Sequence, residues 1–188
     1  MKVSREQMEQ NRTRILAAAS RLFREKGFEA VSVAEVMKAA GLTHGGFYGH
    51  FSSKDDLIAQ ALTQAYQPAE DSQFDFEVFL GRYLSTLHRD NPANGCPTAG
   101  LAAETRHQGV EARAAIAEGL RMQIARISEA LPSGTTGERR RVAIGSWSAM
   151  VGALILARSV DDPNLSEEVL EQTHAWIADM THYLRGAQ

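Results

Sequence analysis

The side chains best suited to contact a charged partner gather in the stretch from Ser32 to Lys54, SVAEVMKAAGLTHGGFYGHFSSK. The Tyr48 hydroxyl and the His50 imidazole N–H can each donate a hydrogen bond to a phosphate oxygen. Lys54 stands at an expected helix start, where its ammonium group and the local backbone amides can meet one phosphate. These residue types predict contact with the phosphate backbone of a nucleic acid.

Two short helices joined by a glycine-containing turn must position these side chains. The first is expected to begin at Ser32 and to end at Gly41, and the second to run from about Thr43 to His50. This is the pattern of a helix-turn-helix, which places its second helix in the major groove of DNA.

The second short helix combines aromatic residues with two glycines. Phe47 and Phe51 lie four positions apart, so they point to one side and are expected to lock this helix onto the preceding ones. Gly45 and Gly46 each cost roughly 1 kcal/mol inside a helix, and a close approach of the backbone to DNA would offset that cost. Tyr48 alone could be an ordinary surface residue, but the whole ordered set favours DNA binding.

Helical spacing recurs along the whole chain, and convincing β-strand alternation is absent. The fold class predicted is therefore all-α. Serine or threonine caps and glycine or proline stops bound the expected helices at about 4–26, 32–41, 43–50, 53–65, 74–90, 97–107, 109–130, 135–160 and 165–184.

Composition points to a globular protein without a membrane anchor. The 188 residues are 44% hydrophobic and 23% charged, and the single Cys96 cannot form an internal disulfide or a CxxC site. The first residues lack an apolar signal segment. The longest apolar run, 142–157, is too short for a comfortable membrane span and is expected to be a buried helix. We therefore expect a cytoplasmic protein.

Charge is unevenly distributed along the chain. The formal net charge is −3, but residues 1–52 hold eight Lys or Arg and five Glu, so this part carries +3 and the remainder −6. A basic N-terminal part on an acidic body is compatible with DNA binding by the N-terminal part.

Three motifs at the N-terminus resemble the TetR family of bacterial transcriptional repressors. They are Ala40-Gly41-Leu42, Phe47-Tyr48-Gly49-His50-Phe51 and Ser53-Lys54-Asp55-Asp56-Leu57. The stretch RILAAASRLFREKGFEAVSV (14–33) is also similar to the family's first helix and its link to the second. The resemblance covers about residues 10–65.

The resemblance implies which residues meet DNA. Phosphate contacts are implied for Ser32, Tyr48, His50 and Lys54. Base contacts are implied for Thr43, His44, Gly45 and Phe47. Residues 43–46 contain no Arg, Lys or Gln, and Ala34 stands where a base-reading Arg can occur. We therefore expect substantial reliance on phosphate positioning and DNA shape.

The resemblance also implies a division of labour. Residues 1–53 would form a three-helix helix-turn-helix DNA-binding domain, and residues 54–188 a helical ligand-binding and dimerisation domain. Helices 141–158 and 165–184 would form a four-helix bundle in a homodimer on palindromic operator DNA. The alternative is that both helices simply pack within one subunit.

Large side chains on the C-terminal helices are candidates for binding a small-molecule effector, with ordinary core packing as the alternative for each. The candidates are Phe79, Tyr83, Cys96, Leu101, Met122, Trp147 and Met150. Cys96 precedes Pro97 at a helix start, where a reactive thiolate is favoured. It could therefore sense oxidants or electrophiles, or it could be a small apolar residue at a helix start.

The predicted function is that of a ligand-responsive transcriptional regulator, a repressor by family habit, released from DNA by a small molecule or by Cys96 modification. A DNA-bound interaction protein without a ligand is the first alternative. A cysteine hydrolase built on Cys96 with His88 or His107 is the second, but no nucleophile motif frames the thiol. His174 and His182 lack the i, i+4 spacing of a metal pair, so neither metal nor cofactor is expected.

Overall fold

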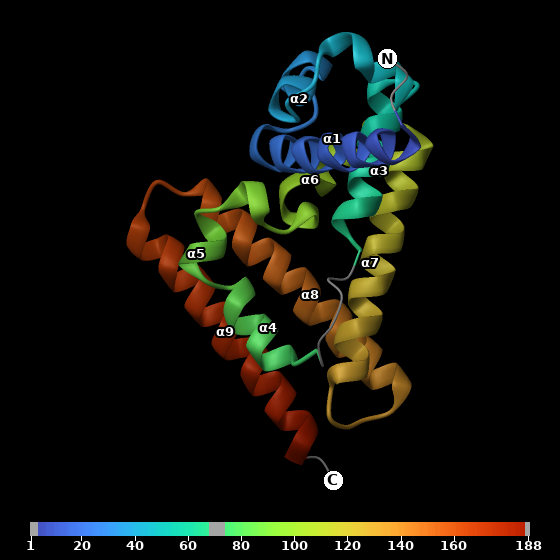
Figure 1. The fold of residues 1–188 in the computed structure, drawn as a ribbon. Helices are drawn as coiled ribbons and strands as arrows, with labels where there is room; N and C mark the ends of the chain where they lie inside the picture. Colours follow the sequence, from blue (N-terminus) through green and yellow to red (C-terminus); the bar gives the residue numbers. More distant parts are fainter. Residues whose placement is uncertain (1–3, 68–73, 187–188) are drawn as a thin grey trace. The chain divides into compact units, whose positions relative to one another are not determined.

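The computed structural model describes residues 4–67 and 74–186, and every regular element in these residues is a helix (Figure 1). The all-α prediction is confirmed. The elements are α1 (Arg5–Lys26), α2 (Val33–Ala39), the 3-10 helix η1 (His44–Gly49), α3 (Lys54–Ala65), α4 (Phe76–Tyr83), α5 (Thr86–Arg89), the 3-10 helix η2 (Pro92–Asn94), α6 (Pro97–Thr105), α7 (Val110–Ala130), α8 (Thr136–Ser159) and α9 (Pro163–Gly186).

The described chain forms two compact units, and each contains two separate stretches of sequence. The first unit holds residues 4–67 and 93–119, and the second holds 74–92 and 120–186. The change from one unit to the other falls inside α7. These compact units do not follow the functional division expected at residue 53, because α3 and α6 belong to the same unit as α1 and α2. That functional division stays a prediction.

Local capping explains where the helices of the first unit begin. The hydroxyl oxygens of Ser4, Ser32 and Ser53 accept hydrogen bonds from the backbone N–H three residues later, at 3.0–3.1 Å. Such caps satisfy a donor that the helix leaves unpaired. The α1 helix ends at Gly27, whose φ of 82° is a conformation that favours glycine. The predicted starts near residues 4, 32 and 53 are therefore confirmed.

Two predicted helices differ in detail. The second helix of the helix-turn-helix is a 3-10 helix rather than an α-helix. The helix expected over 74–90 is broken at Leu84, where φ is −92° and ψ is 51°, and Ser85 caps the start of α5. A serine that offers its hydroxyl to the next backbone N–H groups competes with helix continuation, so the break has a local cause.

In the second unit, α8 and α9 pack against each other, and the Thr135–Glu138 capping box that the sequence predicts starts α8. The α8 helix is long and apolar enough to cross a membrane by composition, with a mean hydropathy of 1.4 over 18 residues. Its inner face, however, carries buried Trp147, Met150 and Leu154. A packed helix of a folded domain passes the same test of composition, and the buried face agrees with the expected buried helix.

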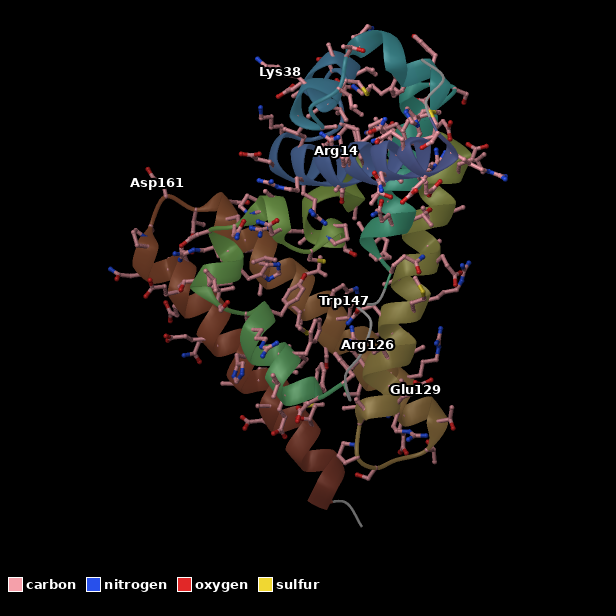
Figure 2. The ribbon with its side chains drawn as sticks, in the orientation of Figure 1. Arg14, Lys38, Arg126, Glu129, Trp147 and Asp161 are labelled. Carbon is pink, nitrogen blue, oxygen red and sulfur yellow. The ribbon has the colours of Figure 1, made fainter. Side chains whose placement is uncertain are left out.

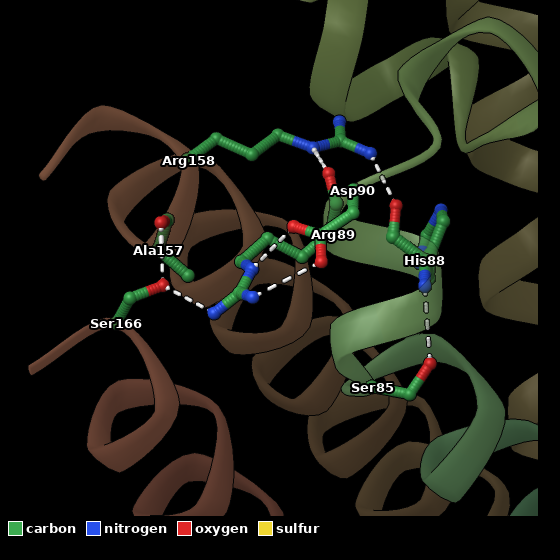
Figure 3. A network of polar contacts seen from close by, with 7 residues as sticks. All are labelled: Ser85, His88, Arg89, Asp90, Ala157, Arg158 and Ser166. Atoms are coloured by element: carbon green, nitrogen blue, oxygen red, sulfur yellow. Dashed lines mark hydrogen bonds and ion pairs between the residues drawn. The ribbon is translucent and has the colours of Figure 1, made fainter. Parts of the chain in front are cut away.

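A polar network fastens α5 to α8 and α9 within the second unit (Figure 3). The Arg158 guanidinium donates to the carbonyl oxygens of His88 and Arg89 at 2.7 and 3.0 Å. The Arg89 guanidinium donates to the Ser166 hydroxyl at 2.9 Å, and that hydroxyl donates to the Ala157 carbonyl at 2.7 Å. A cation at the carbonyl end of a helix interacts favourably with its dipole. Arg158 thus holds a four-residue helix that could not persist alone.

Candidate functional site

The turn between α2 and η1 is built by backbone hydrogen bonds and one glycine. Gly41 adopts a φ of 68°, and the backbone N–H of Leu42 donates to the Met37 carbonyl at 2.9 Å. A positive φ is the conformation that commonly follows a helix end. The chain therefore leaves α2 in a defined direction and delivers η1 to the surface of the first unit.

Two buried rings hold η1 in place. Phe47 and Phe51 are 1% and 2% exposed, and their rings are stacked with centroids 5.7 Å apart. Both belong to the core that α1, α2 and α3 form. The predicted locking role of these two residues is confirmed. Because the rings face the core, the outer surface of η1 is left for a ligand.

The exposed surface of η1 carries most of the residues that the resemblance assigned to base contact. Thr43, His44 and Gly45 are exposed, and Thr43 makes no side-chain capping bond. A Cβ added at Gly45 would meet nothing within 4 Å. The protein therefore does not need a glycine at this position for its own packing.

Phe47 requires a correction. The resemblance placed it among the base-contacting residues, but its side chain is 1% exposed. The ring fills the core of the first unit, so in this structure it supports the surface and cannot reach a base. The conflict arises because one residue cannot serve both the core and the groove, and the apolar core is the stronger demand for a Phe ring.

The residues assigned to phosphate contact lie at the surface. Tyr48 is 74% exposed, with its ring edge-on to Phe47 at 5.2 Å, and Ser32 is exposed at the α2 start. His50 and Lys54 are half-buried. Each keeps a group that can donate to a phosphate oxygen.

Arg12 on α1 is a residue that the sequence reasoning missed. Its guanidinium donates to the His50 carbonyl at 2.8 Å, donates to the Gln60 side-chain carbonyl, and lies 4.8 Å from the Phe51 ring centroid. It therefore joins α1 to the end of η1 and to α3. No local signal could have found it, because its partners are 38 and 48 positions away in sequence.

The start of α3 is organised by Asp56. Its carboxylate accepts from the backbone N–H of Ser52 at 2.8 Å and from the Ser52 hydroxyl at 3.0 Å. These hydrogen bonds, with one from Gln60, hold the pKa of Asp56 below its usual value. The acid therefore remains ionised and fixes the loop before Lys54, which sets where the Lys54 ammonium can meet a phosphate.

Arg14 and Lys38 add positive charge to the same unit (Figure 2). With Arg21 they line a hollow of about 490 Å³ at the surface between α1 and the end of α2. Arg14 lies against Gly41, because a Cβ added there would be 2.7 Å from its Nη2. The basic N-terminal part that the charge count predicts is thus a surface property of the first unit.

The segment 93–104 is attached to the C-terminal end of α1. The Arg24 guanidinium donates to the Ala93 carbonyl at 2.9 Å, and the Glu104 carboxylate accepts from the Phe28 backbone N–H at 2.8 Å. A Cβ added at Gly27 would lie 2.5 Å from Glu104, so glycine is required for this approach. The α6 helix therefore holds the end of the first helix of the helix-turn-helix.

Cys96 lies in this same region as the N-cap residue of α6, and its thiol is half-buried. Its charge acts on Arg24 and on Tyr66. The Tyr66 hydroxyl pairs with the Thr98 hydroxyl at 2.8 Å, and burial raises the pKa of Tyr66 to about 12. Cys96 thus stands among groups that connect α6 with α1 and α3.

The structure brings together three of the seven residues predicted to bind an effector. Rings of Phe79, Tyr83 and Trp147 lie with centroids 5.2–6.3 Å apart, all in the second unit. Met150 lies on the same helix as Trp147 and is fully buried. These four residues remain candidates for an effector site.

The other three candidates are placed differently. Leu101 is 3% exposed and belongs to the apolar core of the first unit, where Cys96 also lies. Met122 is 36% exposed on the second unit's part of α7. The alternative of ordinary core packing therefore holds for Leu101, whose neighbours are the core residues of α1 and α3. Within the described ranges, no three His, Cys, Asp or Glu side chains come together in a group that could hold a metal ion.

A helix-turn-helix with an exposed polar recognition element, in an all-helical chain with a second compact unit, defines a helix-turn-helix DNA-binding regulator. Comparison with known proteins agrees with this class. The family described as "Bacterial regulatory proteins, tetR family" matches residues 15–61. The HTH-type transcriptional repressor NemR of Escherichia coli (strain K12) is 30% identical over 137 residues, which are 65% of this chain and 68% of NemR. The chain belongs to the TetR family of bacterial transcriptional regulators.

Other relatives extend this comparison. The HTH-type transcriptional regulator AcrR of Shigella flexneri is 32% identical over 85 residues, 45% of this chain but only 40% of AcrR. The crystal structure of the reduced form of E. coli NemR covers 90% of this chain and 95% of its own, with 24% identity and a TM-score of 0.71. A TetR-family regulator from Agrobacterium tumefaciens covers 94% and 98%, with 19% identity and a TM-score of 0.73. These relatives are regulators rather than enzymes, and the two structures share the fold of this chain.

Proposed function

We propose that this regulator is a cytoplasmic repressor that binds palindromic operator DNA as a homodimer. A small-molecule effector, or chemical modification of Cys96, releases it from the operator. The observation that carries the proposal is the exposed outer surface of η1, whose polar residues stand over the buried Phe47 and Phe51. The name of the relative NemR, a transcriptional repressor, supports the sign of regulation.

On this proposal, Thr43 and His44 approach base edges, while Ser32, Tyr48, His50 and Lys54 donate to phosphates. The open space around Gly45 lets the backbone itself come close to DNA. Since no Arg, Lys or Gln stands among residues 43–46, bidentate readout of guanine from these positions is not available. Sequence preference then depends largely on the shape and deformability of the operator.

The DNA interface is tested by comparing Tyr48→Ala with Leu87→Ala in mobility-shift titrations at fixed salt. Both side chains are highly exposed, at 74% and 78%, but Leu87 lies in the second unit. We expect Tyr48→Ala to weaken operator binding about tenfold, since a hydrogen bond to a charged phosphate is lost, and Leu87→Ala to bind like the wild type. If Tyr48→Ala binds as tightly as the wild type, the assigned roles are wrong.

Exposed apolar side chains on α8 and α9 support the homodimer. On α8, Ile144, Ile155 and Leu156 are 42–57% exposed, and on α9 Trp176 is 52% exposed. A Cβ added at Gly145 or at Gly152 would meet nothing within 4 Å. Small residues beside exposed apolar ones let a second copy approach closely, and the two helices of each copy would make a four-helix bundle.

The dimer is tested by placing a charge on this surface. We expect Leu156→Glu to weaken self-association at least tenfold in sedimentation velocity, because a carboxylate would be buried in an apolar interface. Leu87→Glu, at a site that is equally apolar and even more exposed, should leave association unchanged. Equal sedimentation of Leu156→Glu and wild type would rule out this surface.

Two triggers for release are proposed. The aromatic cluster of Phe79, Tyr83 and Trp147 is a candidate effector site. Cys96 is the second candidate, because an adduct on the N-cap residue of α6 would disturb the segment that Arg24 fastens to α1. The description of the NemR crystal structure as a reduced form makes a thiol trigger the more relevant for comparison.

The thiol trigger is tested by measuring operator affinity before and after mild peroxide or a thiol-alkylating quinone. We expect treated wild type to bind more weakly, and Cys96→Ser to be unaffected. Serine is a favoured N-cap residue, so this variant retains the helix start. If Cys96→Ser loses affinity as the wild type does, the modified group lies elsewhere.

A further inference from the structure

The second unit contains a continuous group of aromatic side chains from three segments. Phe79 and Tyr83 on α4 face Trp147 on α8, with centroids 6.3 and 5.2 Å from the indole. Phe74, just before α4, lies 5.2 Å from Phe79, and His88 lies 4.6 Å from Tyr83. Faces and edges of this kind attract the edges and faces of further aromatic rings.

The indole of Trp147 has an unsatisfied hydrogen-bond donor. The residue is 4% exposed, and its buried Nε1 has no partner among the described residues. The amide Nε2 of Gln123 on α7 and the guanidinium Nε of Arg139 on α8 are in the same condition, and both belong to this unit. A buried donor without an acceptor is costly, and native structures usually supply one. The three groups lack acceptors, so the missing partner is an acceptor.

A hollow adjoins this group of rings. It measures about 420 Å³, and Phe74, Ala130, Leu131 and Pro132 are among the residues that line it. That volume is within the range of small-molecule sites. The guanidinium of Arg126 on α7 covers the Phe74 ring at 3.9 Å; Figure 2 shows Arg126 on α7 and Trp147 on α8. Phe74 touches both the hollow and Phe79, so it links the surface to the rings around the indole.

We infer that these residues form a site for a neutral, planar aromatic compound whose carbonyl oxygen accepts a hydrogen bond from Trp147 Nε1. The ring of the compound packs against Phe79 and Tyr83. The compound is neutral because the unsatisfied indole and amide N–H groups are neutral donors, and a buried charge would need a partner of opposite sign. Phe79 is only half-buried, so its ring can shift towards the hollow and admit the compound. The inference rests on the proposed function, since it specifies the effector class of the proposed repressor.

The test uses the two indole N–H resonances that a protein with two tryptophans gives in a ¹H–¹⁵N spectrum. The variant Trp176→Phe removes the signal of the exposed tryptophan and thereby assigns that of Trp147. The probes are acetophenone and ethylbenzene, which differ chiefly in the carbonyl oxygen. We expect acetophenone to move the Trp147 proton downfield and to bind about tenfold more tightly than ethylbenzene, as for one hydrogen bond to a buried donor. Ethylbenzene reproduces the ring-current effect without the hydrogen bond.

A shift that is the same for both probes, or absent with acetophenone, overturns the inference. The variant Trp147→Phe gives a second measurement: acetophenone affinity should fall to that of ethylbenzene, while ethylbenzene affinity stays within about twofold. Operator binding is measured on the same samples. If operator binding is intact and the Trp147 resonance is unmoved, the effector class is wrong and the proposed function stands. If the protein does not bind operator DNA, the proposed function fails whatever the resonance does.

Discussion

The Arg12 guanidinium on α1 donates a hydrogen bond to the backbone carbonyl of His50 at 2.8 Å, directly after the recognition element η1. The same group lies against the Phe51 ring and reaches Gln60 on α3. Three helices therefore meet at one planar cation. Because an Arg fork binds several acceptors in fixed directions, this contact determines where His50 and Tyr48 stand relative to α1.

Substitution of Arg12 separates geometry from charge. We expect Arg12→Lys to weaken operator binding several-fold and to lower the free energy of unfolding by about 1–2 kcal/mol, because lysine keeps the charge but loses the fork. Arg12→Ala should lose more on both measures. Titration calorimetry with operator DNA and urea unfolding supply the two numbers. If Arg12→Lys matches the wild type in both, charge alone accounts for the residue.

Gly45 tests how closely the backbone approaches DNA. A methyl group at this position meets nothing within the protein, so Gly45→Ala should keep or slightly raise the melting temperature. We expect operator affinity to fall at least tenfold, since the methyl group would stand between the backbone and DNA. Gly137→Ala, another position with nothing within 4 Å, is the matched control and should bind normally. Wild-type affinity in Gly45→Ala would show that the backbone keeps its distance from DNA.

Gly27 tests the attachment of α6 to the end of α1. Its φ is 82°, and a Cβ would lie 2.5 Å from a Glu104 carboxylate oxygen that is part of the contact with Phe28. Gly27→Ala should therefore lower the free energy of unfolding by about 1–3 kcal/mol through strain at positive φ and displacement of the carboxylate. Urea unfolding measures the loss. Gly137→Ala, which is helical and unhindered, should gain up to about 1 kcal/mol, and equal values for the two variants would contradict the close approach.

His88 links stability to pH. Burial, followed by the charge of Arg158, lowers the pKa of His88 despite its hydrogen bond to the Tyr83 carbonyl. The folded state thus binds a proton less readily than the unfolded state, for which the pKa is 6.5. This contribution to stability is complete above pH 6.5 and is lost as pH falls through the folded pKa.

Melting temperatures between pH 7.5 and pH 5 test this contribution. The wild type should lose more than His88→Asn, whose amide can still donate to the Tyr83 carbonyl but does not titrate. His107→Asn is the control, because His107 is exposed, and it should follow the wild type. If His88→Asn shows the same pH slope as the wild type, another group is responsible for the acid sensitivity.

Features that depend on neighbours in sequence were predictable. The caps at Ser4, Ser32, Ser53 and Thr135 join residues three positions apart, so residue type and spacing suffice to indicate them. The buried pair Phe47 and Phe51 followed from helical spacing for the same reason. The break at Leu84 was missed because the apolar spacing of 74–90 continues across it, although Ser85 supplied the signal.

By itself, the sequence determined the all-helical class, the helix-turn-helix and most helix starts, because short-range capping and periodicity carry that information. Tertiary structure alone decided that Phe47 belongs to the core, that Leu101 supports the first unit, and that the Trp147 indole lies buried without an acceptor. It also decided the Arg12–His50 and Glu104–Phe28 contacts, which join residues 38 and 76 positions apart. Such contacts depend on how helices pack, and packing follows from the shapes of all the core side chains together rather than from any local pattern.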